Sequence, residues 1–339
     1  FPGGSRIKNL STPDKWVDIK ETDGNIRRIR FDYPSEGVRI ESLAVGPDGE
    51  VYGSTRHPLR IYNYNPENES LSNFGLMNRR GHWNAITSAN NIIYGGEYSD
   101  GKLLRYDPAA SWLPGDTPNP NPDQIMEAFP VINRPHAILH VDEYDAIFMT
   151  GTPGYGHTGG GAVIYDINNN TWTVLDDSHL IPDQSTTALV SMGGNSILGG
   201  TTVQPGKGGK QIAEAPELYL FDIDRQKVVW REKPFHGMHQ IQDMLVGPNG
   251  LVYGIAVSSH HGGNNPTFFV FNPSSRELVH SEAMVADYGN VAGRQAPRIM
   301  TWGSGGMILV LFAKHIVQID PTTFAHQSLA ETPVKVEAG

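Results

Sequence analysis

Short apolar runs alternate with turns along most of the chain, in a unit that recurs six times. Each unit holds an apolar run, a turn, a second run ending in small residues, a variable loop, and a third run that closes on an aromatic or aliphatic residue followed by Asp or Asn. The second runs lie at 51–53, 93–95, 147–149, 197–199, 252–254 and 308–310. A further run after the third predicts a fourth strand. Repeated four-stranded units of this length are typical of propeller blades, so the sequence predicts an all-β fold, a β-propeller.

The segment 16–33 alternates like two strands around the turn Asp23-Gly24, but it lacks the upstream strands of a full repeat. Propellers remove exposed sheet edges when strands from both chain ends share a blade, and 333–337 could supply such a strand. We therefore expect seven four-stranded blades, six full repeats and one composite closing blade, with six blades as the alternative. We expect one domain over 1–339. Its repeats begin near 38, 81, 135, 186, 239 and 297, and the closing blade comes from 1–37 and the C-terminus.

Charge and composition narrow the classes of partner. The 339 residues carry 26 Lys and Arg against 36 Asp and Glu, a formal net charge of −10. A broadly positive surface is what nucleic acids and anionic membranes require, so neither is an expected partner. There are no cysteines, which excludes disulfides and thiolate chemistry. We expect a secreted or periplasmic monomer from which a signal segment has been removed.

Polar side chains recur where each first strand begins and in the loops between second and third strands, two sets of positions that share one face of a propeller. The longest of these loops fall in the third, fourth and fifth repeats, and long loops on a rigid scaffold commonly carry function. The strand starts and loops supply Arg80, His82, Tyr98, Arg134, His136, Tyr155, His157, Gln184, Lys207, His239, His260 and Arg294.

Several arginines and histidines with few carboxylates suit an anionic ligand. Only Glu36, Asp183 and Asp243 lie near, too few for the oxygen shell of a calcium-dependent lactonase. The mixture meets the needs of β-elimination from a uronate. That reaction needs a base tuned near neutrality, a cation beside the carboxylate, and an acid for the leaving oxygen. Histidine, arginine and tyrosine can fill these roles in that order.

On its repeats and on His82, His136, Tyr98, Tyr155, Arg80, Arg134 and Arg294, the chain resembles the propeller polysaccharide lyases that cleave oligogalacturonate, ulvan or rhamnosyl-glucuronate chains. The resemblance implies a lyase acting on an anionic polysaccharide or oligosaccharide. We expect His136 as the first candidate base, because Arg134 and Pro135 fix its approach to the strand, with His82 and His239 next. Tyr98 and Tyr155 are the candidate acids. Substrate would contact Arg80, Arg134, Arg294, Gln184, His157, Lys207 and His260.

The metal question stays open at this point. The oligogalacturonate branch holds a metal in a Q-x-x-H-x-H run, whereas this chain has His236-Gly237-Met238-His239-Gln240. A metal-dependent mechanism is therefore not favoured. If a divalent metal binds, the candidate ligands are His82, His136, His239 and Gln184.

Two other functions compete with the lyase. A non-catalytic propeller that binds a glycan or a protein would show a shallow face with aromatic platforms, because fold alone does not fix function. A lyase acting on a cyclic ester antibiotic would need a wide apolar cavity, and the polar loops argue against it.

Overall fold

The chain forms two compact units in the computed structural model, residues 1–38 and 39–339. The structure describes residues 3–12, 14–32, 39–56, 59–75, 81–115, 117–258, 265–292 and 299–332. All six predicted repeats fall in the second unit, where the sequence analysis had expected one domain over the whole chain.

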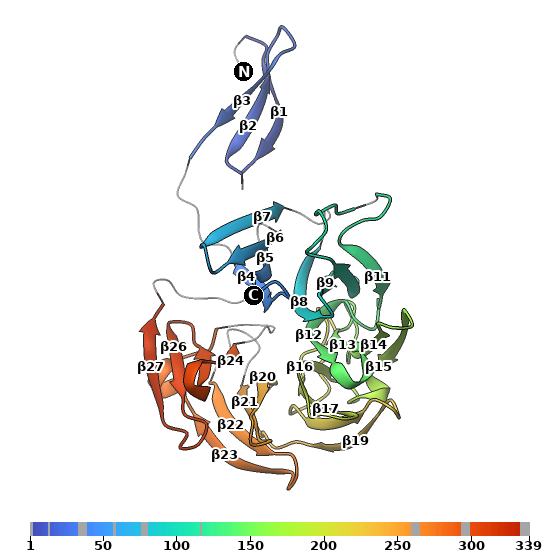
Figure 1. Ribbon diagram of the computed structural model, residues 1–339, viewed down its shortest axis with the longest axis vertical. Helices are drawn as coiled ribbons and strands as arrows, with labels where there is room; N and C mark the ends of the chain where they lie inside the picture. The colour runs from blue at the N-terminus through green and yellow to red at the C-terminus, as the bar shows by residue number, and fades with distance from the viewer. Residues whose placement is uncertain are drawn as a thin grey trace. The chain divides into compact units, whose positions relative to one another are not determined.

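The second unit is built from six four-stranded antiparallel sheets, each formed by four strands consecutive in the chain. Figure 1 shows the sheets set around a common centre, with the first strand of each sheet innermost. A single residue pair, Thr202 with Gln240, joins the fourth sheet to the fifth. The strands are β4 (Arg39–Val45), β5 (Val51–Arg56), β6 (Arg60–Asn65) and β7 (Ser70–Gly75); β8 (His82–Ala89), β9 (Ile92–Tyr98), β10 (Lys102–Tyr106) and β11 (Asp123–Glu127); β12 (Arg134–Val141), β13 (Ala146–Thr152), β14 (Gly161–Asp166) and β15 (Thr171–Asp176); β16 (Ser185–Ser191), β17 (Ser196–Thr202), β18 (Leu218–Asp222) and β19 (Lys227–Glu232); β20 (Gln240–Val246), β21 (Val252–Val257), β22 (Thr267–Asn272) and β23 (Glu277–Ala283); β24 (Met300–Trp302), β25 (Ile308–Leu311), β26 (His315–Ile319) and β27 (His326–Glu331).

Helices are short in the described part of the chain. The α-helix α1 covers Val285–Tyr288, and three single 3₁₀ turns cover Asp142–Tyr144, Asp177–His179 and Ser304–Gly306. None of the helices that the structure describes is long and apolar enough to cross a membrane.

The first unit is a three-stranded antiparallel sheet of β1 (Arg6–Ser11), β2 (Trp16–Lys20) and β3 (Ile26–Arg30). One face carries Leu10, Val17 and Ile29 in a row across the strands, and Leu10 and Ile29 are exposed. On the other face Arg28 donates to both carboxylate oxygens of Asp18, at 2.7 and 2.9 Å, and lies over the ring of Trp16. This unit is therefore amphipathic: Leu10 and Ile29 are exposed on its apolar face, while Ile19 on the same face is 4% exposed.

The count of blades in the described residues is six. The sequence analysis preferred seven and kept six as the alternative. Strands β1 to β3 pair only with one another in the described ranges, and the proposed closing strand at 333–337 lies outside them. The composite seventh blade therefore stays a prediction.

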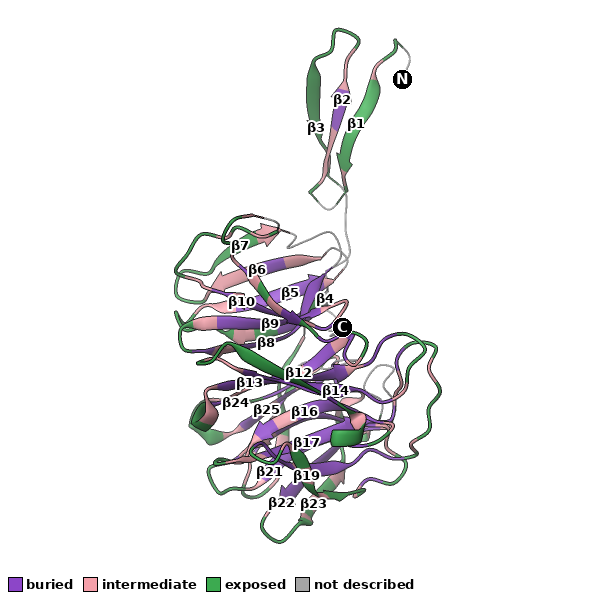
Figure 2. Ribbon diagram, turned by 90° about the vertical axis from the view of Figure 1, so that its right-hand side faces the viewer, coloured by how far each residue is buried: buried purple, intermediate pink, exposed green. Residues whose placement is uncertain are grey.

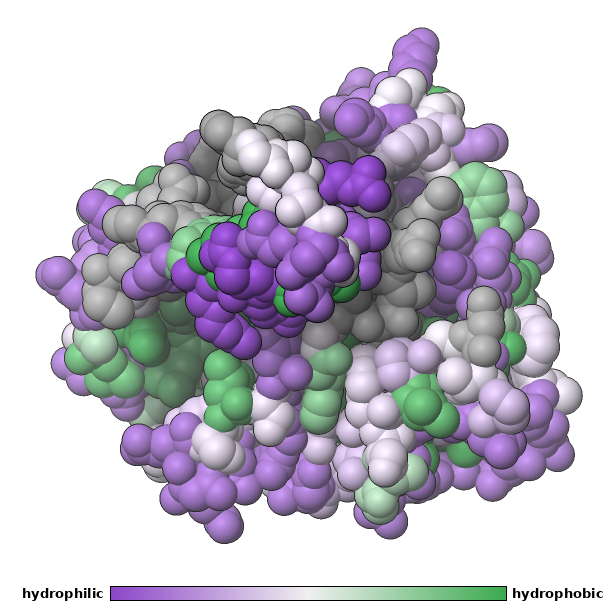
Figure 3. Space-filling view, turned by 90° about the horizontal axis from the view of Figure 1, so that it is seen from above, coloured by the Kyte–Doolittle hydropathy of each residue, from purple (hydrophilic) through white to green (hydrophobic). Residues whose placement is uncertain are grey.

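Neighbouring blades of the second unit pack through apolar faces. Figure 2 shows buried residues concentrated in the inner strands, while outer strands such as β23 alternate between exposed and partly buried positions. Glycines in the second strands make this packing possible: a side chain at Gly199 would overlap the ring of Tyr219, and one at Gly254 would overlap the ring of Phe269. In the first, fourth and fifth blades, a glycine of the second strand thus leaves the space into which a third-strand aromatic ring fits: Gly53 for Tyr62, Gly199 for Tyr219 and Gly254 for Phe269. On the face shown in Figure 3, exposed hydrophobic residues lie in small groups among hydrophilic ones.

A β-bulge recurs at one place in the inner strands of the first five blades. In each of β4, β8, β12, β16 and β20, the register with the second strand shifts by one residue, which leaves that residue without a partner in the ladder. All five bulge residues are polar and buried: Glu41, Asn84, His136, Thr187 and Gln242. Bulges redirect side chains and concentrate near functional sites.

These bulges also join the blades. At the bulges of the second to fifth blades, the carbonyl of the residue before the bulge accepts a hydrogen bond from a side chain of the preceding blade. Asn84 Nδ2 donates to Pro135 O at 2.8 Å, and Thr187 Oγ1 donates to Ile241 O at 2.8 Å. A buried carbonyl needs such a partner, because an unpaired one would cost about 1–3 kcal/mol. The bulges therefore hold the inner strands in register with one another.

Candidate functional site

An arginine and two tyrosines meet where the second blade adjoins the third. Tyr98 ends β9, Arg134 begins β12, and Tyr155 lies in the loop after β13. The hydroxyl oxygens of Tyr98 and Tyr155 are 2.5 Å apart, and the Arg134 guanidinium carbon lies 4.2 Å from the centre of the Tyr98 ring. We call Tyr98, Arg134 and Tyr155 the Tyr–Arg cluster. The structure thus brings together three residues that the sequence analysis selected from separate repeats.

The environment keeps Tyr98 protonated. Burial raises the pKa of the Tyr98 phenol, and the hydrogen bond with Tyr155 raises it further, while the nearby Arg134 charge acts in the opposite direction. Tyr98 is partly buried, whereas Tyr155 is 56% exposed. A protonated, hydrogen-bonded pair with one exposed member can donate a proton to a ligand and is unsuited to act as the initial base.

His82, at the start of β8, is buried beside this cluster. Its ring centre lies 5.5 Å from that of Tyr98, and its exposed fraction is 2%. His82 Nε2 is 2.8 Å from Asn84 Oδ1 and 3.9 Å from Glu41 Oε1. Because Asn84 Nδ2 donates to Pro135 O, the amide oxygen of Asn84 must face His82. The proton of a neutral His82 therefore sits on Nε2, and Nδ1 is its basic nitrogen.

The long loops of the third and fourth repeats form one wall. Gly156 N donates to Lys207 O at 3.0 Å, Gly206 N donates to His157 O at 3.1 Å, and Thr158 Oγ1 donates to Lys210 O at 2.6 Å. A side chain at Gly209 would overlap the His157 carbonyl, so the glycines let the two backbones approach this closely. The side chains of His157 and Lys207 are exposed on this wall.

The remaining candidates lie elsewhere. His136 lines the central channel, with its Nε2 3.2 Å from Thr152 Oγ1. Gln184 is buried, where it accepts from Thr201 Oγ1 at 2.6 Å and donates to Glu217 Oε1 at 3.1 Å. That arrangement is a structural network between β16, β17 and the start of β18.

His239 precedes β20 and is partly exposed; its backbone bonds to Val257 and Val203. The candidates Arg80, Arg294 and His260 lie outside the described residues. The metal set proposed from sequence, His82, His136, His239 and Gln184, is not assembled: within the described ranges, no group of three or more His, Asp or Glu side chains is placed to hold a metal ion.

Two polar residues in the inner strands escaped sequence analysis. Asn84 orients His82, and Gln242 lines the central channel. Both strands carry several polar residues, so the sequence did not single out these two. Regular alternation cannot assign such a residue to a face, because a bulge shifts the side-chain period by one.

No protein-family model matches the chain, and no curated protein matches it. Solved structures resemble it in fold. Hydrazine synthase of Kuenenia stuttgartiensis has a TM-score of 0.62 at 11% identity, covering 86% of this chain and 80% of that one. The WD40 β-propeller domain of Doa1 has a TM-score of 0.59 at 10% identity, covering 88% and 85%. A chain of the mitotic checkpoint complex has a TM-score of 0.54 at 11% identity, covering 87% and 78%.

These similarities show that the chain is a β-propeller, as the repeats predicted. At such low identity these similarities show only the fold and not the function, since one fold hosts many unrelated functions.

Proposed function

We propose that this protein is a polysaccharide lyase that cleaves a uronate-containing glycan by β-elimination. The observation that carries the proposal is the Tyr–Arg cluster: a guanidinium 4.2 Å from a tyrosine ring whose hydroxyl is bonded to a second, exposed tyrosine. The loop wall bearing His157 and Lys207 adds positive charge for an extended anionic chain. The resemblance to propeller lyases supports the same reading.

Each chemical requirement of the elimination has a candidate group. Arg134 would neutralise the uronate carboxylate, which stabilises the enolate-like intermediate formed when the neighbouring carbon loses its proton. The Tyr98–Tyr155 pair would protonate the leaving glycosidic oxygen, since Tyr98 holds its proton at neutral pH. The proton on carbon passes to a base, the carbon–oxygen bond breaks, and a carbon–carbon double bond forms.

Two histidines are candidates for the base. His82 contacts the cluster through the ring of Tyr98, and its tautomer leaves Nδ1 basic. His136, ranked first from sequence, lies two residues beyond Arg134 but faces the central channel. We propose that His82 acts as the base; its Nδ1 is buried, so this role requires the His82 side chain to gain access to the bound substrate. Parallel alanine variants at both positions distinguish the two, and loss of activity only in the His136 variant would reverse the assignment.

The test is to incubate the protein with a panel of uronic acid polysaccharides and follow ultraviolet absorbance. Elimination leaves a double bond conjugated to the carboxylate, so absorbance should rise on at least one polymer. Parallel samples with a chelator show whether a metal is needed. If the folded protein leaves every polymer intact but migrates more slowly in a gel that contains one of them, the function is that of a non-catalytic binding propeller.

Replacing Asn84 with aspartate is expected to move the acid limb of the kcat/KM profile to higher pH by about one unit. A carboxylate that accepts from Nε2 stabilises the imidazolium form of a histidine more than an amide does. Only neutral His82 can act as base, so activity would then require a higher pH. The control is Asn73→Asp, which adds the same charge at an exposed site on β7. If the acid limb of the kcat/KM profile coincides with that of wild type in both variants, His82 is not the base.

A further inference from the structure

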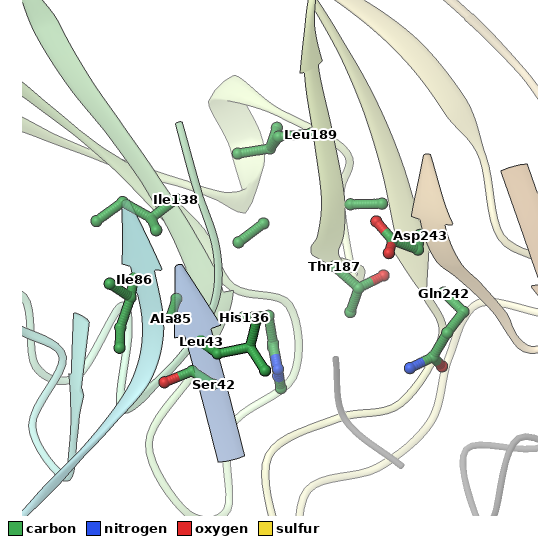
Figure 4. Close-up of a pocket in the computed structure, with 12 residues that line it drawn as sticks. Ser42, Leu43, Ala85, Ile86, His136, Ile138, Thr187, Leu189, Gln242 and Asp243 are labelled. Carbon is green, nitrogen blue, oxygen red and sulfur yellow. The ribbon is translucent and has the colours of Figure 1, made fainter. Parts of the chain in front are cut away.

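The cavity in the central channel is too small for a sugar ring. Inner strands of the first five blades line it, and its volume is about 40 Å³. At about 10–15 Å³ for each water, it has room for roughly three waters. Figure 4 shows His136, Thr187 and Gln242 among the residues around it. A glycan that meets the Tyr–Arg cluster cannot continue into this cavity, so its neighbouring sugars need contacts on the surface of the second unit.

Phe129, in the segment between β11 and β12, offers such a contact. It is 51% exposed, whereas every other phenylalanine that the structure describes is buried or partly buried. Its neighbours in the chain are anchored: Ala128 is 3% exposed, Ile132 is fully buried, and Ile132 N donates to Ala128 O at 3.0 Å. The exposed ring is therefore carried on a fixed backbone, which reduces the entropy lost when a ligand binds.

The ring of Phe129 lies against the loop that carries Tyr155. Gly154 N donates to Pro130 O at 2.9 Å, which holds this loop to the Phe129 segment. A side-chain carbon added at Gly154 would lie 2.9 Å from Phe129 Cε2 and 3.5 Å from His157 Cδ2, so both rings flank one point of the backbone. The next residue is Tyr155 of the Tyr–Arg cluster, which is 56% exposed. Phe129 is thus not a lone exposed residue, and a group of this kind marks a binding surface.

Polar groups border the Phe129 ring. The exposed imidazole of His157 can form hydrogen bonds with hydroxyl groups. Lys207, whose carbonyl accepts from Gly156 N at 3.0 Å, adds an exposed positive charge to the same wall. The Asp177 carboxylate lies farther along this loop, beside Gly159, and accepts from Asp183 N at 2.7 Å. An apolar ring edged by hydrogen-bonding groups matches a sugar, which presents C–H groups on a face and hydroxyl groups around its edge.

We propose that Phe129 is a stacking platform for the sugar next to the uronate at the Tyr–Arg cluster. The proposal rests on the glycan function proposed above, because the cluster alone identifies where the uronate lies. The face of an aromatic ring is negative and attracts the partly positive C–H groups of a sugar. Stacking acts on the bound chain and not on the bonds that react, so it lowers KM with little effect on kcat.

The experiment measures how strongly the whole chain is slowed in native gels that contain polygalacturonate, alginate, hyaluronan or ulvan. Phe129→Leu keeps an apolar side chain against Gly154 but removes the ring. It should weaken binding to a polymer that slows the wild type by about tenfold, and raise KM on a cleaved polymer by a similar factor with kcat within about twofold. Phe129→Trp should restore both values. The matched control is Trp172→Leu, which removes an exposed ring from the outer strand β15 and should bind as wild type does.

Salt separates stacking from charge at this surface. Raising NaCl from about 0.1 M to about 1 M shortens the Debye length from about 10 Å to about 3 Å. The ratio of wild-type affinity to Phe129→Leu affinity should stay the same across this range. The corresponding ratio for Lys207→Ala should fall toward one, because that variant removes a charge.

The outcomes separate the platform from the lyase. If Phe129→Leu binds and cleaves like wild type, or if Trp172→Leu loses as much affinity, the platform is rejected while the lyase stands. If the wild type cleaves no polymer but is slowed by one, and Phe129→Leu is not, the lyase is rejected while the platform stands. A wild type that neither cleaves nor is slowed by any of the polymers contradicts both proposals.

Discussion

Replacing Arg134 by alanine is expected to lower kcat/KM on the cleaved polymer by about 100- to 1,000-fold, with the protein still folded. In the proposed elimination, the guanidinium would stabilise charge that develops on the uronate carboxylate as the proton leaves, so most of the loss should fall in kcat. The same residue lies 4.2 Å from the Tyr98 ring and opposes the rise of the Tyr98 pKa. Initial rates over a range of substrate concentrations, from the absorbance assay, measure the effect.

Tyrosine variants complete this test. Tyr98→Phe and Tyr155→Phe remove one hydroxyl each from the 2.5 Å pair and should each slow the reaction, because the proton donor is lost or left unsupported. Matched controls are Arg225→Ala and Tyr144→Phe, whose side chains pair with the carboxylates of Asp222 and Asp224. Full activity in Arg134→Ala together with both tyrosine variants would place the chemistry elsewhere on the molecule.

Asp243→Ala is expected to destabilise the second unit by about 3 kcal/mol or more. The Asp243 carboxylate accepts from the backbone N–H groups of Met244, Ile299 and Met300, at 2.9, 2.7 and 3.0 Å, and so joins the fifth blade to the start of the sixth. Alanine leaves these buried donors without a partner. At roughly 2–4 °C per kcal/mol, Tm should fall by about 6–12 °C. Thermal unfolding followed by circular dichroism measures the change.

The control for this loss is Asp320→Ala. Asp320 also accepts from two backbone N–H groups, those of Thr322 and Thr323, but in an exposed turn where water can replace it. Its Tm should remain close to that of wild type. Equal decreases in Tm in the two variants would contradict this prediction, because they would mean that the hydrogen bonds of Asp243 between blades contribute no more to stability than those of Asp320 in its turn.

Much of the fold was readable because each blade repeats the same local rules. The fourth strand expected after each third run appears, for example as β15 and β19, and in three blades a glycine of the second strand lies where a third-strand ring fits. Strand β11 was harder to place, because the segment between β10 and β11 interrupts the repeat and carries the isolated bridge between Leu113 and Asn121.

The site was only partly readable. Tyr98, Arg134 and Tyr155 could be assigned to one face from their positions in the repeats, and the structure brings them into contact. The separation of His136 and Gln184 from that cluster depends on bulges and buried networks. A bulge is a one-residue offset in hydrogen bonding with no marker in composition, so the orientation of His136, Asn84 and Gln242 could not be derived from the pattern.

The five bulges have a consequence for how this protein could acquire new specificity. Each bulge residue stands outside the ladder, so its identity is less constrained by strand pairing than that of its neighbours. The five positions already hold a carboxylate, two amides, an imidazole and a hydroxyl on otherwise similar strands. Two of them, Asn84 and Thr187, also donate to buried carbonyls of the following blade, so a change at either position would alter the joint between two blades as well as the chemistry around the channel.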